Sequence, residues 1–158
     1  MSDQERWDAA LLLLDLASQL GREMRQHLEP ELRKQGLVSP LELRVCGAID
    51  DLGPQRPIDL ARLLHLPIST VSELSDRLVQ AGLLLRERNP QDRRSVVLAP
   101  TVKTHQAVQA LRRAAAGWLA DVLGRLDEET LHDLLQGLRR TAEQLPGDGE
   151  RSCGGSEG

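Results

Sequence analysis

The stretch PIDLARLLHLPISTVSELSDRLVQAGLLLRERNPQDRRSVVLAPT, residues 57–101, decides the fold of this chain. Its first part predicts two short helices, over residues 59–64 and 69–81, because apolar residues recur there at helical spacing. The turn between them is His65-Leu66-Pro67, and Gly82 is placed to end the second helix in a left-handed conformation. Two short helices joined by a tight turn form a helix-turn-helix.

The second part of this stretch predicts a β-hairpin. Residues 83–88 and 95–98 have the pattern of strands, and Asn89-Pro90-Gln91-Asp92 has that of the turn between them. A hairpin that directly follows the second helix is a wing. The sequence therefore predicts a winged helix-turn-helix.

Longer helices are predicted on both sides of the winged region. One is expected over residues 4–32 and another over residues 40–52; after the hairpin, one runs to about residue 126 and the next covers residues 127–145. The apolar face of the first helix consists of Trp7, Leu11, Leu14, Gly21, Leu28 and Leu32. These patterns predict a mostly α protein, and the lack of Phe and Tyr agrees with packed helices rather than a β-barrel.

Four side chains are expected to cap these helices. Ser39 is a cap, and Glu42, three residues later, is expected to reach back to its amide. Asp59, Thr101 and Asp127 stand where they are expected to accept hydrogen bonds from the first amides of their helices.

The charge is distributed unevenly along the chain. The net charge is −4, but residues 56–94 hold seven arginines against five acidic residues, so this segment is +2 and the remainder is −6. Such an asymmetry is expected when one part of a protein faces DNA, because phosphates require a positive surface.

Other classes of protein find little support in the sequence. There is no Gly-rich phosphate loop, no Gly-x-Ser-x-Gly and no His-Glu-x-x-His, so we expect no enzyme, no cofactor and no metal site. No segment is apolar enough to span a membrane and no signal peptide is seen, so a cytoplasmic protein is expected. Cys46 and Cys153 make no disulfide framework; a buried, structural Cys46 is expected, with an oxidant-sensing thiol as the alternative.

The winged region resembles the MarR (multiple antibiotic resistance regulator) family of transcription regulators. The resemblance is carried by Leu60-Ala61, Gly82-Leu83, Arg86, Arg88, Asp92-Arg93-Arg94, Leu98 and Thr101. Its most specific part is Asp-x-Arg, followed four residues later by Leu and three after that by Thr. It covers residues 5–145 and is strongest over residues 57–101.

This resemblance implies a homodimer with intertwined terminal helices. The expected parts are an N-terminal dimerisation helix (1–36), the DNA-binding winged domain (37–101) and C-terminal dimerisation helices (102–145). Residues 146–158 lack apolar side chains and are expected to be disordered.

The resemblance also implies double-stranded operator DNA as the partner, with the second short helix in a major groove and the wing over the backbone. The polar outer face of that helix agrees with this role. Candidate DNA-binding residues are Ser69, Thr70, Ser72, Glu73 and Arg77 on the helix, Arg86 and Arg88 on the first strand, and Asp92, Arg93 and Arg94 at the wing tip. By the resemblance, Asp92 orients Arg94. Glu73 stands where relatives commonly have a basic residue, so a sequence preference is not carried over.

The expected function is a sequence-specific repressor that binds a pseudo-palindromic operator and is released by a small ligand or an oxidant. The alternative is a winged-helix dimer that acts through protein–protein interaction without specific DNA binding. The acidic balance of the chain and the carboxylates of Glu73 and Asp76 on the recognition helix support that alternative. The effector and its binding residues are not identified.

Overall fold

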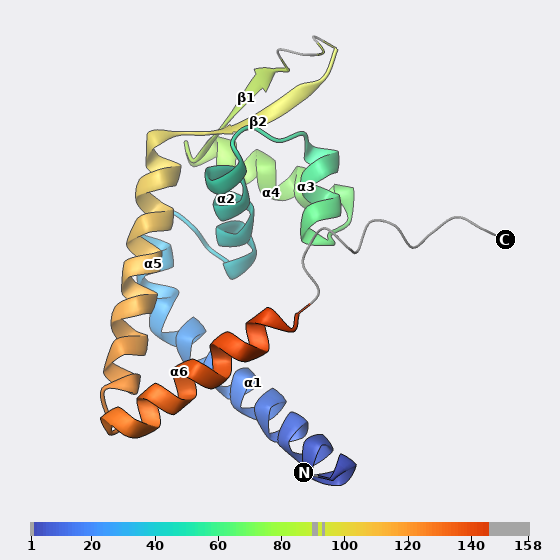
Figure 1. Ribbon diagram of the computed structural model, residues 1–158. Helices are drawn as coiled ribbons and strands as arrows, with labels where there is room; N and C mark the ends of the chain where they lie inside the picture. Colours follow the sequence, from blue (N-terminus) through green and yellow to red (C-terminus); the bar gives the residue numbers. More distant parts are fainter. Residues whose placement is uncertain (1, 90–91, 93, 146–158) are drawn as a thin grey trace, which may run out of the picture. The chain divides into compact units, whose positions relative to one another are not determined.

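The computed structural model describes residues 2–89, 92 and 94–145. The helices are α1 (Asp3–Lys34), α2 (Pro40–Leu52), α3 (Pro57–Leu64), α4 (Ile68–Gln80), α5 (Val102–Leu123) and α6 (Glu128–Glu143), and the strands are β1 (Leu84–Arg88) and β2 (Val96–Pro100) (Figure 1). The predicted mostly α fold with a winged helix-turn-helix is confirmed. The predicted disordered tail, residues 146–158, lies outside the described residues.

The chain divides into two compact units within α5, after Trp118. The first contains α1 to α4, the sheet and most of α5; the second contains the end of α5 and α6. The winged region lies wholly in the first unit. The further division into dimerisation and DNA-binding parts stays a prediction.

The helix-turn-helix consists of α3 and α4. His65 ends α3 in a left-handed conformation with φ of 52°, and the amide of Leu66 donates to the carbonyl of Ala61 at 2.9 Å. At the far end of α4, Gly82 has φ of 71°, and the amide of Leu83 donates to the carbonyl of Leu78 at 2.9 Å. A positive φ favours glycine, so the predicted helix end at Gly82 is confirmed.

The wing is an antiparallel pair of strands, with Leu84 opposite Pro100 and Arg88 opposite Val96. A third backbone segment joins it: Gln55 exchanges two hydrogen bonds with Leu98, its amide donating at 3.0 Å and its carbonyl accepting at 2.8 Å. The sequence indicated only a loop at residues 53–57. The wing is therefore attached at the middle of β2 to the connection between α2 and α3.

One hydrophobic core supports these elements. Its buried side chains come from every element of the first unit, and the largest fully buried aliphatic ones are Leu37, Val45, Ile49, Leu60, Val71, Leu78, Leu83, Leu84, Leu98, Val108 and Leu111. The elements that carry the candidate DNA-binding residues are therefore packed against one another through a shared interior.

One predicted cap and one predicted capping-box contact are corrected by the structure. α3 begins at Pro57, and Asp59 lies in its first turn, where it accepts hydrogen bonds from Arg56 (Nε at 2.6 Å, Nη2 at 3.0 Å) and not from the helix amides. Proline at the first helical position explains the earlier start, because its missing N–H needs no partner there. Glu42 also does not reach the amide of Ser39, because its carboxylate is bound to Val38 and Arg77.

The other caps are confirmed. Ser39 Oγ accepts from the amide of Glu42 at 3.2 Å, and Asp127 Oδ1 accepts from the amide of Thr130 at 2.8 Å. Thr101 Oγ1 accepts from the amide of Thr104 at 3.2 Å.

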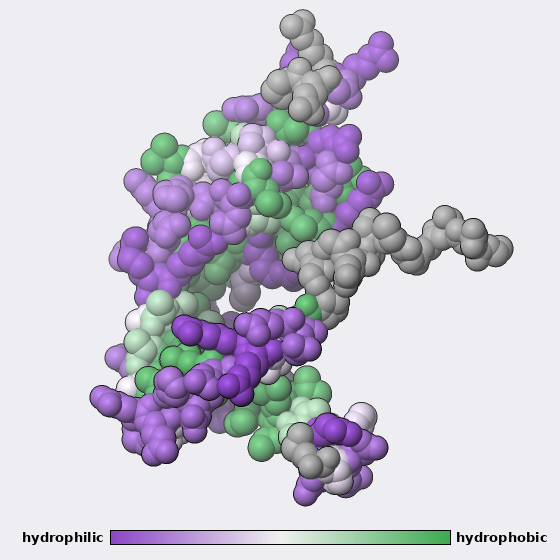
Figure 2. Space-filling model, viewed as in Figure 1, coloured by the Kyte–Doolittle hydropathy of each residue, from purple (hydrophilic) through white to green (hydrophobic). Residues whose placement is uncertain are grey.

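Among the residues that the structure describes, most of the apolar side chains of α1 are exposed. Of its apolar side chains only Leu28 and Leu32 are buried. The exposed ones are Trp7, Leu11, Leu12, Leu13, Leu14, Leu16 and Leu20. Figure 2 shows the corresponding hydrophobic surface on the N-terminal half of the helix. A contiguous exposed patch of this kind marks an interaction surface.

Candidate nucleic-acid interface

The outer face of α4 is polar and exposed. Its exposed polar side chains are Ser69, Ser72, Glu73, Asp76, Arg77 and Gln80, whereas Thr70 is half-buried. The opposite face places Val71, Ser75 and Leu78 in the core, and Ser75 donates to the carbonyl of Val71 at 2.6 Å. A helix with one polar face held by a buried apolar face is suited to lie in a groove of DNA.

Arg77 lies at the edge of that face and is bound within the protein. Its Nη2 donates to Oε1 of Glu42 on α2, forming an ion pair across 35 residues of sequence. The sequence suggested Arg77 as a DNA contact but did not suggest this partner.

Arg86 connects the wing to α4. Its Nη2 donates to Oδ1 of Asp76, and both side chains are about half exposed. Arg88 is also exposed and, two residues further along β1, lies on the same side of the strand as Arg86. The structure thus brings both predicted strand arginines to one side of the wing, with Arg86 nearest to α4.

The wing tip is described at Asp92 and Arg94 only; Arg93 lies outside the described residues. Asp92 Oδ1 accepts from the backbone amide of Arg94 at 3.0 Å, and its carbonyl accepts from the amide and hydroxyl of Ser95, each at 3.0 Å. The contact between Asp92 and Arg94 is therefore made through the backbone, which shapes the turn that carries the Arg94 side chain.

The C-terminal end of α4 is fixed by the start of α5. Lys103 Nζ donates to the carbonyl of Ala81 at 2.7 Å, and Thr101 Oγ1 donates to the carbonyl of Gly82 at 3.0 Å. Thr104 Oγ1 adds a hydrogen bond to the carbonyl of Leu83. Lysine near a helix C-terminus also suits the negative end of the helix dipole. Lys103 was not among the candidate residues predicted from the sequence, although its charge just beyond the hairpin is visible there.

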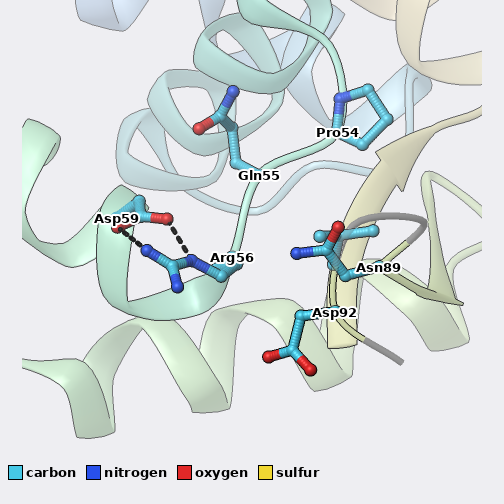
Figure 3. A pocket seen from close by; sticks show the side chains of 7 residues that line it. Pro54, Gln55, Arg56, Asp59, Asn89 and Asp92 are labelled. Atoms are coloured by element: carbon cyan, nitrogen blue, oxygen red, sulfur yellow. Dashed lines mark hydrogen bonds and ion pairs between the residues drawn. The ribbon is translucent and has the colours of Figure 1, made fainter. Parts of the chain in front are cut away.

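An open pocket of about 520 Å³ lies between the wing and the segment that begins at Pro54 and leads into α3. It is lined by Pro54, Gln55, Arg56, Asp59, Asn89, Asp92 and Val97, and Figure 3 shows the Arg56–Asp59 pair on one side and Asn89 with Asp92 on the other. The hydrogen bond from Arg56 holds the pKa of Asp59 below its ordinary value and raises the pKa of Arg56. Both side chains are therefore charged at neutral pH, and the pocket is polar.

Cys46 is fully buried on α2, as expected from its apolar neighbours. Burial, with a smaller contribution from the charge of Asp50, raises the pKa of its thiol to about 12. The thiolate is the reactive form, so Cys46 is nearly inert at neutral pH.

This inertness is open to a direct measurement. In a Cys153→Ser variant, Cys46 is expected to react with a disulfide reagent only after unfolding by guanidinium, with less than about a tenth of the thiol consumed in the time that a free cysteine takes to react fully. Rapid reaction of the folded variant near pH 7 would contradict the structural role.

Within the described ranges, no three His, Cys, Asp or Glu side chains gather as metal ligands would. No helix among those residues has the length and apolar character needed to cross a bilayer.

Comparisons with known proteins agree with the site. Residues 38–96 match the model of the MarR family. The chain is 29% identical over 142 residues to the HTH-type transcriptional repressor MdtR of Bacillus subtilis, covering 90% of this chain and 86% of MdtR. It is 28% identical over 112 residues to the uncharacterised HTH-type transcriptional regulator YcgE of the same organism, covering 71% of this chain and 73% of YcgE.

A solved structure shares the fold along nearly the whole chain. The crystal structure of the YusO protein from Bacillus subtilis superposes with a TM-score of 0.72 and 26% identity, covering 92% of this chain and 99% of YusO. The matched segment, residues 38–96, contains α2, α3, α4 and most of the wing. The winged-helix region of this chain therefore matches the MarR family of transcriptional regulators.

Proposed function

We propose that the chain is a homodimeric, sequence-specific DNA-binding repressor. The observation that carries this proposal is the exposed polar face of α4 beside a wing that presents Arg86, Arg88 and Arg94, all within a MarR-family domain. The relative MdtR is named a transcriptional repressor, which supports repression rather than activation as the proposed effect.

Each group of side chains has a distinct role in this proposal. Short polar residues on α4 meet base edges in the major groove: these are Ser69, Thr70, Ser72 and Glu73. Phosphates are bound by Arg77, Arg86 and Arg88 and, at the wing tip, by Arg93 and Arg94, while Asp92 shapes the turn. Glu73 is the residue able to accept from a cytosine amino group, so it contributes to sequence preference.

The dimer places two copies of α4 in neighbouring major grooves of a pseudo-palindromic operator. Binding there blocks access to the promoter. A small effector molecule releases the protein by favouring a conformation in which the two copies no longer match the groove spacing. The buried Cys46 argues against release through oxidation of that thiol.

The test is a fluorescence-anisotropy titration with DNA from upstream of the protein's own gene, beside scrambled DNA of equal length and at two salt concentrations. Tight, salt-sensitive binding that prefers the native sequence supports the proposal. Equal binding to both DNAs contradicts it and favours the winged-helix dimer that binds a protein partner, for which Glu73 and Asp76 supply exposed acidic groups.

Arg94→Ala gives a sharper test of the wing. If Arg94 binds a phosphate, the variant is expected to weaken binding to native and scrambled DNA alike and to lower the salt slope by about one unit. Arg113→Ala, which removes an exposed arginine from α5, is the matched control and should leave both quantities unchanged. An Arg94→Ala protein with wild-type affinity and slope would show that the side chain makes no phosphate contact.

A further inference from the structure

Glu42 is a buried carboxylate that links three parts of the first unit. It lies on α2 with 1% of its side chain exposed. Its Oε2 accepts from the amide of Val38 at 2.6 Å, and its Oε1 accepts from Nη2 of Arg77 on α4. A carboxylate in such a position depends on both partners, because an unpaired charge in the interior is costly.

Arg77 connects this buried group to the surface. Half of its side chain is exposed, although its partner is not. A guanidinium has five N–H donors in a planar fork, so the hydrogen bond to Glu42 leaves other donors for a second acceptor such as a phosphate. The ion pair restricts the rotamers of Arg77 before any ligand is present.

The C-terminal end of α4 is thus held from two different sides. α2 holds Arg77 through Glu42, and α5 holds the carbonyl of Ala81 through Lys103. Val38 belongs to the connection between α1 and α2, so Glu42 also ties that connection to α4. Removing the charge of Glu42 releases one of the two attachments.

We propose that Glu42 is a positioning residue for DNA binding, which holds Arg77 and, through it, the orientation of α4. This inference rests on the proposed DNA-binding function. Glu42 is too deeply buried to touch DNA, so it acts through Arg77. A side chain that is ordered before binding loses less conformational entropy on binding, which raises affinity without a new contact.

The experiment is a double-mutant cycle with Glu42→Gln, Arg77→Gln and the double variant, measured by the same anisotropy titration. Glu42→Gln keeps the size of the side chain and an acceptor for the amide of Val38 but removes the charge. Each single variant is expected to bind operator DNA about tenfold more weakly, and the double variant to be no weaker than Arg77→Gln alone. If Glu42 had only a structural role, Glu42→Gln would instead weaken DNA binding by the same factor in the Arg77→Gln protein as in the wild type.

Glu31→Gln is the matched control, since Glu31 is a partly buried carboxylate on α1 that binds Gln35 and Lys34. It should leave the affinity unchanged. If Glu42→Gln unfolds, Glu42→Asp replaces it in the cycle, because the shorter side chain withdraws the carboxylate from Arg77 while keeping the charge. The same non-additive result is expected.

The outcomes separate this inference from the function on which it rests. If the wild type binds its operator but Glu42→Gln binds equally well, or if the two effects add, the role of Glu42 is refuted and the proposed function stands. If the wild type shows no preference for the operator, both fail together.

Discussion

The double variant Leu11→Asp/Leu14→Asp is expected to be monomeric and to bind operator DNA at least about 100-fold more weakly than the wild type. Both leucines lie on α1, and about half or more of each side chain is exposed in the single chain. A dimer that covers them buries apolar surface, whereas two carboxylates there would remain charged and unpaired. A monomer reaches one half-site only, so it loses the gain from binding two linked sites.

The measurements use the small number of aromatic residues. Light scattering after size-exclusion chromatography gives the oligomeric state. In a Trp118→Leu background, Trp7 is the one remaining tryptophan, and it is 64% exposed in the single chain. Its emission should therefore shift to longer wavelength when the double variant dissociates.

Leu63→Asp is the control for oligomeric state, because Leu63 is equally exposed but lies on α3. That variant should remain dimeric. If the double variant also remains dimeric, α1 is not the dimerisation helix. If it is monomeric yet keeps its affinity, the protein binds DNA without needing the dimer.

Elements with strong local signals at their ends were predictable from the sequence. α2 runs from Pro40 to Leu52 as expected, because Ser39 and Pro40 mark its start and Gly53 follows its last residue. The end of α4 at Gly82 was predictable for the same kind of reason. The predicted start of α3 was wrong, because Pro57 at the first helical position determines it and the acidic side chain of Asp59 does not.

Features that depend on distant residues could not be predicted. The pairing of Gln55 with Leu98 uses backbone atoms alone, so no side-chain pattern marks it. Glu42 fits a local capping box, but a partner 35 residues away takes its carboxylate. A short sequence pattern carries no information about a distant side chain that competes for the same carboxylate.

For the candidate site, the sequence predicted which side chains lie on the exposed face of α4, but not which side chains contact one another. Helical periodicity correctly placed Ser69, Ser72 and Glu73 on the exposed side of α4. The ion pair of Arg86 with Asp76 was missed, since it depends on how the wing packs against that helix. Which of these side chains touch DNA stays a prediction.

Leu98→Ala is expected to lower the free energy of unfolding by about 2–5 kcal/mol, a large part of the roughly 5–15 kcal/mol that a domain of this size has. Leu98 is completely buried in β2, where it lies opposite Arg86 of β1 and exchanges two backbone hydrogen bonds with Gln55. Because these backbone hydrogen bonds hold the residue in place, the surrounding side chains cannot easily close the cavity that the missing atoms leave. The loss of unfolding free energy should therefore lie toward the upper part of this range of about 2–5 kcal/mol.

Val96→Ala is the matched control for that measurement, because Val96 lies two residues earlier in β2 with 46% of its side chain exposed. It should change the free energy of unfolding by about 0.5 kcal/mol or less. Denaturant unfolding at one fixed protein concentration gives both values, since dimerisation makes apparent stability depend on concentration. Equal losses of unfolding free energy in the two variants would mean that this part of the wing adds little to the core. A large loss in Leu98→Ala alone would show that the wing and the connection between α2 and α3 unfold together with the core.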